Sequence, residues 1–150
     1  MKTNYSVTVE DNPSQADLDT IEANLVRYND SQAEKENWQP IAVLLRDEHG
    51  EIVAGLAGHT HWNWLSISNL WVSETLRGQG YGRKLMSMVE QEAMKRGCNH
   101  AHLDTFDFQA LPFYQKLGYE VFGMLEDFPP GHVNYYLQKR LEEGKEAQSM

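Results

Sequence analysis

A glycine-rich turn between a strand-like run and a helix-like run is the feature that most constrains the fold of this chain. The turn covers residues 77–82 and reads Arg-Gly-Gln-Gly-Tyr-Gly. Residues 65–72 before it resemble a strand, and residues 83–96 after it carry apolar side chains at helical spacing up to Gly97. Such a turn can point several backbone N–H groups at one place, where the helix dipole adds partial positive charge. The sequence therefore predicts a phosphate-binding turn and a nucleotide-like ligand.

Two familiar phosphate motifs do not fit this turn. The dinucleotide fingerprint requires a third glycine where this chain has Arg83. The Walker loop requires Ser or Thr after its lysine, and Lys84 is followed by Leu85. A tight turn with a purely structural role is the alternative for the glycine pattern taken alone.

Length, composition and charge indicate a small globular protein. The chain has 150 residues, 41% of them hydrophobic, which predicts one domain over residues 1–150 with a frayed tail at 142–150. No apolar run approaches the roughly 20 residues that span a membrane, and residues 1–5 lack the apolar core of a secretion signal. Cys98 is the single cysteine, so no intrachain disulfide forms and a cytoplasmic location is predicted.

The formal net charge of −9 bears on the class of partner. A nucleic-acid partner requires a basic face, so this charge argues against one. It is compatible with a cationic partner such as an amine.

Periodicity predicts a mixture of strands and helices. A strand at 5–10 precedes a helix that starts at Pro13 and runs through Tyr28, and residues 30–39 are ambiguous between a short helix and a loop. The remaining expected elements are strands at 41–46, 51–57, 65–72, 100–105, 119–126 and 133–141, and helices at 83–96 and 109–117.

Two motifs in the right order resemble the GNAT superfamily of N-acetyltransferases. Arg77, Gly80 and Gly82 fit the pattern [Arg/Gln]-x-x-Gly-x-[Gly/Ala], which is similar to the acetyl-coenzyme A pyrophosphate loop of that family. Residues 110–119 resemble its second signature, A-x-x-[Phe/Leu]-Tyr-x-Lys-x-Gly-[Phe/Tyr]. Both motifs together are far more specific than either alone. The resemblance covers about residues 41 to 141.

The resemblance implies an α+β fold with a mixed, mostly antiparallel central sheet flanked by helices. Its parallel pair would be the strands at 65–72 and 100–105, joined through the helix at 83–96 by a right-handed crossover. In the family these two strands splay apart and the pantetheine arm of the cofactor lies between them.

The same resemblance implies the cofactor-binding residues. Many family members have an asparagine just before the second signature helix, and here Gln109 could take its place. Arg77 would either contribute charge to the phosphates or stay an exposed loop cation. The implied residues for acetyl-coenzyme A are Leu70, Trp71, Val72, Arg77, Gly78, Gln79, Gly80, Tyr81, Gly82 and Gln109.

The chemistry implied is direct attack of an amine on the thioester. Tyr114 matches the tyrosine of the family that acts as general acid to the coenzyme A thiolate, whereas periodicity alone makes it a core aromatic. The general base is not identifiable, with Asp104 as the candidate and a strand-end cap as its alternative role. Glu74 can simply be solvated.

Histidines and tryptophans surround the expected central strands. His59 and His61, and likewise His100 and His102, form His-x-His pairs, but they fall on strands two steps apart, roughly 10 Å from each other. One four-histidine zinc site is therefore not expected, and no metal is predicted. Trp62, Trp64 and Trp71 can line an acceptor pocket or pack inside, and Cys98 is expected to be an inert thiol.

The sequence thus predicts an N-acetyltransferase that moves acetyl from acetyl-coenzyme A to a primary amine of a small molecule. The loop at 128–132 and residues 28–38 would set specificity. Transfer of a larger acyl group, a coenzyme A sensor without turnover and a plain interaction domain remain alternatives. A homodimer is compatible with the resemblance, since family members often pair through their last strands.

Overall fold

The computed structural model describes residues 3–142, and residue contacts divide the chain into two compact units. The units are Met1–Lys35 and Glu36–Met150, and each is described by itself. The prediction of a single domain over residues 1–150 therefore stays a prediction. Apart from Glu142, the predicted tail lies outside the described residues.

The first unit contains one helix, α1, over Gln15–Gln32. It begins after Ser14, whose side-chain oxygen accepts a hydrogen bond from the Asp17 N–H at 3.1 Å. None of its side chains is buried, so residues 3–35 form no hydrophobic core of their own. The strand predicted at residues 5–10 is wrong: these residues are exposed and carry no regular secondary structure.

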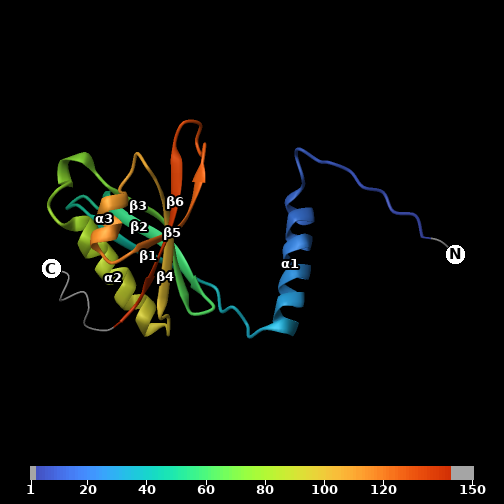
Figure 1. The fold of residues 1–150 in the computed structure, drawn as a ribbon. Coiled ribbons are helices and arrows are strands. Elements are labelled where there is room, and N and C mark those ends of the chain that lie inside the picture. Colours follow the sequence, from blue (N-terminus) through green and yellow to red (C-terminus); the bar gives the residue numbers. More distant parts are fainter. Residues whose placement is uncertain (1–2, 143–150) are drawn as a thin grey trace. The chain divides into compact units, whose positions relative to one another are not determined.

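The second unit is built on a six-stranded sheet with the order β1-β2-β3-β4-β6-β5 (Figure 1). Among the described strands, β3 and β4 form the one parallel pair, and all other neighbours are antiparallel. This arrangement confirms the predicted fold class. The strands are β1 (Gln39–Arg46), β2 (Ile52–His61), β3 (Trp64–Val72), β4 (His100–Phe106), β5 (Glu120–Glu126) and β6 (Val133–Arg140).

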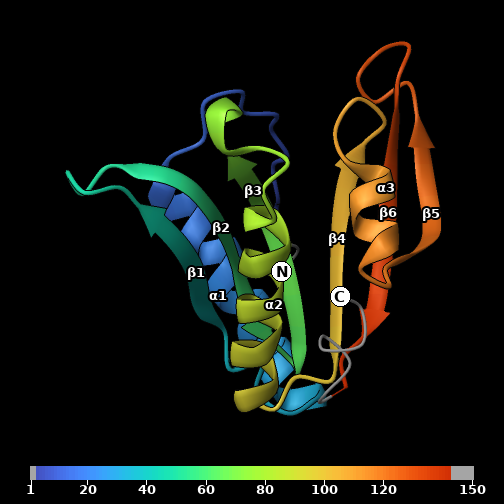
Figure 2. The same ribbon diagram turned by 90° about the vertical axis from the view of Figure 1, so that its left-hand side faces the viewer.

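Two helices and a short 3-10 turn complete this unit. The turn is η1 (Glu74–Leu76), and the helices are α2 (Tyr81–Lys95) and α3 (Leu111–Lys116). Both helices lie on the same face of the sheet (Figures 1 and 2). The apolar side of α2 is buried as the periodicity predicts, with Leu85, Met86, Val89 and Ala93 in the core.

The sheet divides where β3 and β4 stop pairing. Their parallel register runs from Trp64 opposite His100 to Ile67 opposite Leu103 and goes no further. A β-bulge disturbs the β2–β3 register at the same level, between Ala57 and Gly58. A side chain at Gly58 would collide with the Ser66 carbonyl, so the close approach of the two strands requires glycine. Beyond this level β3 and β4 diverge, as Figure 2 shows.

A buried polar cluster joins α2 to the strands on the far side of the split. The Glu90 carboxylate of α2 accepts a hydrogen bond from the Tyr119 hydroxyl and pairs with Lys139 of β6, both at 2.8 Å. Burial and the Glu90 carboxylate raise the pKa of Tyr119 well above its ordinary value, so the hydroxyl stays protonated and donates. These contacts connect the β1–β3 side of the unit to the β4–β6 side.

Candidate active site

The site is built on the gap between the diverging ends of β3 and β4. Residues 69–72 of β3 pair with β2, and residues 104–106 of β4 pair with β6, but the two segments do not pair with each other. Each strand therefore presents backbone groups to the gap without a strand partner on that side. An extended, amide-rich ligand can bond to such groups as an added strand would.

The glycine turn follows the C-terminal end of β3 and the short helix η1, and it leads directly into α2. Gly78 and Gly80 have φ angles of 77° and 89°, a left-handed conformation that favours glycine, and a Cβ at either position would meet nothing within 4 Å. Gly80 caps α2, and its carbonyl accepts the first helical hydrogen bond, from the Lys84 N–H at 3.1 Å. The preceding N–H groups of the helix have no intrahelical acceptor, so open space and backbone donors coincide here. This combination fits an anionic phosphate.

Three polar side chains that the sequence assigned to the cofactor make local hydrogen bonds. The Arg77 guanidinium donates through Nε to the Val72 carbonyl at 3.0 Å, which fastens the turn to the end of β3. The Gln109 side-chain oxygen accepts from the Phe106 N–H at 2.8 Å and from the Thr105 hydroxyl at 3.2 Å. Gln79 likewise donates to the Thr75 carbonyl. Their contact with a cofactor therefore stays a prediction.

The strand residues assigned to the cofactor lie where their backbone faces the gap. Leu70 and Val72 pack their side chains against the core, whereas Trp71 is 52% exposed. At the turn, Gly82 lies against the Phe113 ring of α3. A Cβ added at this position would come within 3.2 Å of that ring. The structure thus brings β3, the glycine turn and α3 together around one gap.

Tyr114 is a buried core residue of α3, as its periodicity predicted, and its role as general acid stays a prediction. Its ring packs in the core, 6.2 Å from the ring of Tyr119. Burial, together with the negative charge of Asp104, raises the pKa of Tyr114 to about 12. The hydroxyl is therefore protonated at neutral pH and can donate a proton.

Asp104 belongs to a small hydrogen-bonded group that the sequence did not reveal. With the Asn134 amide oriented to satisfy its neighbours, its nitrogen donates to Asp104 Oδ2 and to the Thr105 carbonyl, both at 3.2 Å. Its oxygen accepts from the Tyr136 hydroxyl at 3.3 Å. Asn134 is 1% exposed, so this bridge between β4 and β6 fixes one carboxylate oxygen of Asp104.

The histidine pairs lie on the sheet face opposite α2 and α3. Leu65, Ile67, Ala101 and Leu103 point into the core, so the alternate residues of β3 and β4 point to the other face. There the Trp64 ring stacks on His100 at 4.5 Å and meets His102 edge-on at 5.6 Å. We call His59, His61, Trp64, His100 and His102 the histidine face.

The two histidine pairs lie on the strands that the sequence predicted for them. β2 and β4 are two steps apart in the sheet, and the charges of His61 and His59 both lower the pKa of His102. In residues 3–142, no group of three or more His, Cys, Asp or Glu residues is arranged to hold a metal. The imidazoles therefore influence each other electrostatically across Trp64 and Ser66 of β3.

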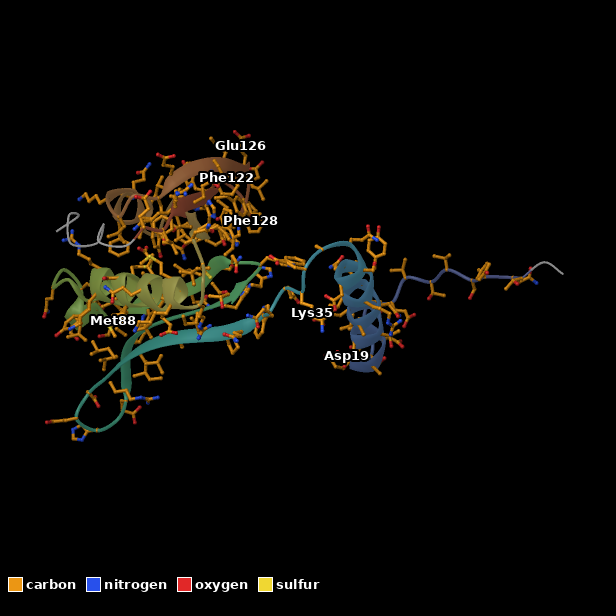
Figure 3. All side chains as sticks on the ribbon, turned by 90° about the horizontal axis from the view of Figure 1, so that it is seen from below. Asp19, Lys35, Met88, Phe122, Glu126 and Phe128 are labelled. Atoms are coloured by element: carbon orange, nitrogen blue, oxygen red, sulfur yellow. The ribbon has the colours of Figure 1, made fainter. Side chains whose placement is uncertain are left out.

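Aromatic side chains gather where β4 ends and where the β5–β6 loop returns. The rings of Phe106 and Phe108 stack at 5.4 Å, and Phe128 lies 5.6 Å from Phe106. The Asp107 carboxylate holds both loops together, because it accepts from the Val133 N–H at 3.0 Å and pairs with His132 at 2.8 Å. Figure 3 shows Phe128 and Phe122 on this β5–β6 part of the chain.

A protein-family comparison agrees with this geometry. The model described as "Acetyltransferase (GNAT) family" matches residues 10–119. The chain belongs to the GNAT acetyltransferase family. Its membership makes the protein an acyltransferase, as the two motifs predicted.

Individual relatives support the same family. Blasticidin-S acetyltransferase of Streptomyces morookaense is 41% identical over 95 residues, which cover 63% of this chain and 70% of the relative. The crystal structure of an acetyltransferase from Bacillus cereus matches with a TM-score of 0.82 and 33% identity, over 89% of this chain and 98% of that chain. An aminoglycoside 6'-N-acetyltransferase solved with coenzyme A shares the fold, with a TM-score of 0.61, 20% identity and coverage of 69% and 73%.

Within this GNAT protein, several site features carried no recognisable sequence signal. Asn134 and Tyr136 come from β6, whose register with β4 cannot be read from one sequence, and only that register brings them to Asp104. Burial raises the pKa of the Cys98 thiol, and its inertness stays a prediction. In residues 3–142, no helix is both long and apolar enough to cross a membrane.

Proposed function

We propose that this GNAT protein transfers the acetyl group of acetyl-coenzyme A to a primary amine of a small molecule. The observation that carries the proposal is the coincidence of three features at one gap. They are the unpaired edges of β3 and β4, the open glycine turn at the start of α2 and the protonated Tyr114. The fold shared with a structure that holds coenzyme A supports the choice of donor.

The donor would lie along the gap with its pyrophosphate at the glycine turn. The backbone N–H groups at the start of α2 supply hydrogen bonds and the positive end of the helix dipole to the phosphates. Gly78 and Gly80 leave room for the phosphate oxygens. Backbone groups of Leu70, Trp71 and Val72 face the gap and would hold the pantetheine amides, once Arg77 releases or shares the Val72 carbonyl.

Tyr114 would act as general acid to the departing thiolate. Its pKa of about 12 keeps the phenol protonated across the physiological range, so a proton is available when the carbon–sulfur bond breaks. Because the side chain is buried in the core, its hydroxyl needs little reorganisation before reaction.

The carboxylate of Asp104 would bind the amino group of the acceptor. Asn134 occupies one oxygen of its carboxylate, which leaves the other oxygen for the ammonium group of an acceptor. In the simplest version of the mechanism Asp104 also takes the proton, as the sequence suggested. The formal net charge of −9 favours the approach of a cation.

The acceptor proposal starts from the named activity of a relative. Blasticidin S is the first amine to test, because an acetyltransferase named for it is 41% identical over 95 residues. The rings of Phe106, Phe108 and Phe128 offer an apolar surface near the open end of the gap. Such rings can pack against a flat or cationic small molecule. A cytoplasmic location and a homodimer remain predictions from the sequence.

The first experiment is a calorimetric titration of the purified protein with acetyl-coenzyme A. We expect micromolar binding in the wild type and at least a tenfold loss in Gly80→Asp, because the new carboxylate would repel the pyrophosphate. Release of coenzyme A thiol in the presence of blasticidin S then measures transfer.

A matched control separates phosphate repulsion from backbone strain. Gly50 has a φ of 82° and, like Gly80, nothing within 4 Å of a Cβ, but it lies in the β1–β2 turn. Gly50→Asp imposes similar strain and should bind acetyl-coenzyme A as the wild type does. Equal loss in both variants, or no binding by the wild type, would refute the assignment of the glycine turn. Binding without thiol release would favour a coenzyme A sensor.

A further inference from the structure

We propose that His102 is the proton acceptor of the reaction: it takes the proton of the amine that Asp104 holds. This inference rests on the proposed function and divides two tasks that the sequence left to one carboxylate. Asp104 supplies the negative charge that binds an ammonium group, and His102 supplies the base that makes the nitrogen a nucleophile.

His102 lies at the closed end of the gap. It is opposite Ser66 in the parallel register, one residue before the last pair of Ile67 and Leu103. Asp104 is the next residue of β4 on the same face and the first beyond that last pair. Two residues of a strand are about 7 Å apart, so one amine nitrogen, or a water bound to it, can reach both side chains.

The His102 ring is available for a new hydrogen bond. It is half-buried and meets the edge of Trp64 at 5.6 Å, and no hydrogen bond from residues 3–142 reaches its nitrogens. Its neighbours differ in this respect. His61 Nδ1 pairs with Glu36 at 3.2 Å, and His100 Nδ1 pairs with Asn99 at 2.7 Å.

The surrounding charges set the protonation state of His102. His61 and His59 face it from β2, while Asp104 and His100 flank it on β4. On β3 its neighbours Trp64 and Ser66 carry no charge, and on β6 it lies opposite Gln138, with Arg140 opposite His100. Burial, followed by His61 and His59, lowers the pKa of His102 from 6.5, and Asp104 offsets only part of that effect.

A lowered pKa has a direct consequence for a base. His102 is neutral at neutral pH and holds a lone pair ready to accept a proton. An imidazole is in general a better match than a carboxylate for an ammonium proton, because its ordinary pKa lies nearer to neutral pH. Since the neighbouring imidazoles disfavour the charged ring, the accepted proton passes on to solvent rather than staying.

The proton balance of the reaction is complete with these groups. A primary ammonium ion has three protons on nitrogen, and the amide product keeps one. The first proton goes to a His102 nitrogen, after which the neutral amine forms the carbon–nitrogen bond to the acetyl carbon. As the carbon–sulfur bond breaks, Tyr114 protonates the sulfur, and the second nitrogen proton restores Tyr114 by way of solvent. The net release to solvent is one proton.

The test compares His102→Gln with the wild type by thiol release across pH 5 to 9. The probes are blasticidin S as the amine and, in a separate assay, water as the sole acceptor. The wild type should lose kcat as pH falls through the His102 pKa, which lies below 6.5. In His102→Gln this acid limb should disappear and kcat should fall about 100-fold, with unchanged affinity for acetyl-coenzyme A.

Two further variants separate a base from a structural residue. His100→Gln alters the same strand and face at a ring that already has a partner, and it should keep both rate and acid limb. His61→Gln removes a positive neighbour, so the His102 pKa should rise and the acid limb should move to higher pH. A merely structural role for His102 would not respond to His61 in this way.

The outcomes are distinct. An acid limb and kcat that survive in His102→Gln would overturn the proposal and leave the proton to Asp104. Equal losses in His102→Gln and His100→Gln would overturn it as well, because general damage to the histidine face would then explain both. A wild type that releases no thiol with either probe would overturn the proposed function itself.

Discussion

Individual residues show how much of the site one sequence could predict. Gly78 and Gly80 adopt the left-handed conformation expected of a phosphate turn, because their spacing is a local property of the chain. Arg77 and Gln109 instead make hydrogen bonds to nearby backbone, which a motif match cannot reveal. Asn134 could not be predicted, since its partners Asp104 and Tyr136 meet it only through strand pairing.

Tyr114→Phe tests the general acid. Removing the hydroxyl should lower kcat about 100-fold and change the KM for acetyl-coenzyme A little, because the ring still packs in the core. Since the pKa of Tyr114 is about 12, loss of its proton should give no alkaline limb below pH 10. Steady-state kinetics of thiol release from pH 7 to 10 measure both quantities.

Tyr119→Phe is the matched control for this prediction. It also removes a buried tyrosine hydroxyl, but one that donates to Glu90 rather than to a substrate. It should cost about 1 kcal/mol of unfolding free energy and leave kcat unchanged. An alkaline limb near pH 8 that vanishes in Tyr114→Phe would contradict the assigned role.

At the scale of elements, periodicity placed most helices and strands within a few residues of their observed bounds. The exceptions have physical causes. Residues 5–10 alternate in hydrophobicity, yet a strand exists only where a second strand pairs with it. The ambiguous residues 30–39 divide between the end of α1 at Gln32, a loop and the start of β1 at Gln39, because helix and strand signals are both weak there.

The β-bulge beside Gly58 lies where β3 and β4 begin to diverge, and it opens the gap between them. Gly58→Ala should lower the free energy of unfolding by about 1–3 kcal/mol, because its Cβ would meet the rigid Ser66 carbonyl. Gly55→Ala is the control, since its Cβ would meet the movable Leu44 side chain at 3.1 Å. Urea denaturation measures both. Equal costs in the two variants would argue against a special role for the bulge.

For the whole chain, the two motifs predicted the sheet of the second unit, including its parallel pair and the divergence of β3 and β4. The motifs could do so because they mark the two ends of one crossover. They carried no information on residues 1–35, whose contacts group apart from those of residues 36–150. That grouping depends on contacts between distant segments, which local patterns do not encode.

Hydrogen exchange tests the role of the gap in the whole molecule. Backbone N–H groups of residues 68–72 and 104–106 that face the gap lack a strand partner there, so they should exchange quickly in the free protein. Saturating acetyl-coenzyme A should slow exchange in these segments and at the start of α2. Protection confined to the exposed loops, with none in β3, would place the ligand elsewhere.

Because β3 and β4 pair over only part of their length, the unfolding free energy of the protein also depends on the concentration of its ligand. A ligand that completes the sheet adds about 2.7 kcal/mol to the unfolding free energy when its concentration is a hundred times its dissociation constant. Besides the shared hydrophobic core, four residue pairs and the Glu90 cluster join the two halves of the sheet. In a cell that exhausts its acetyl donor, the enzyme would then be less stable and more readily cleaved by proteases, as well as inactive.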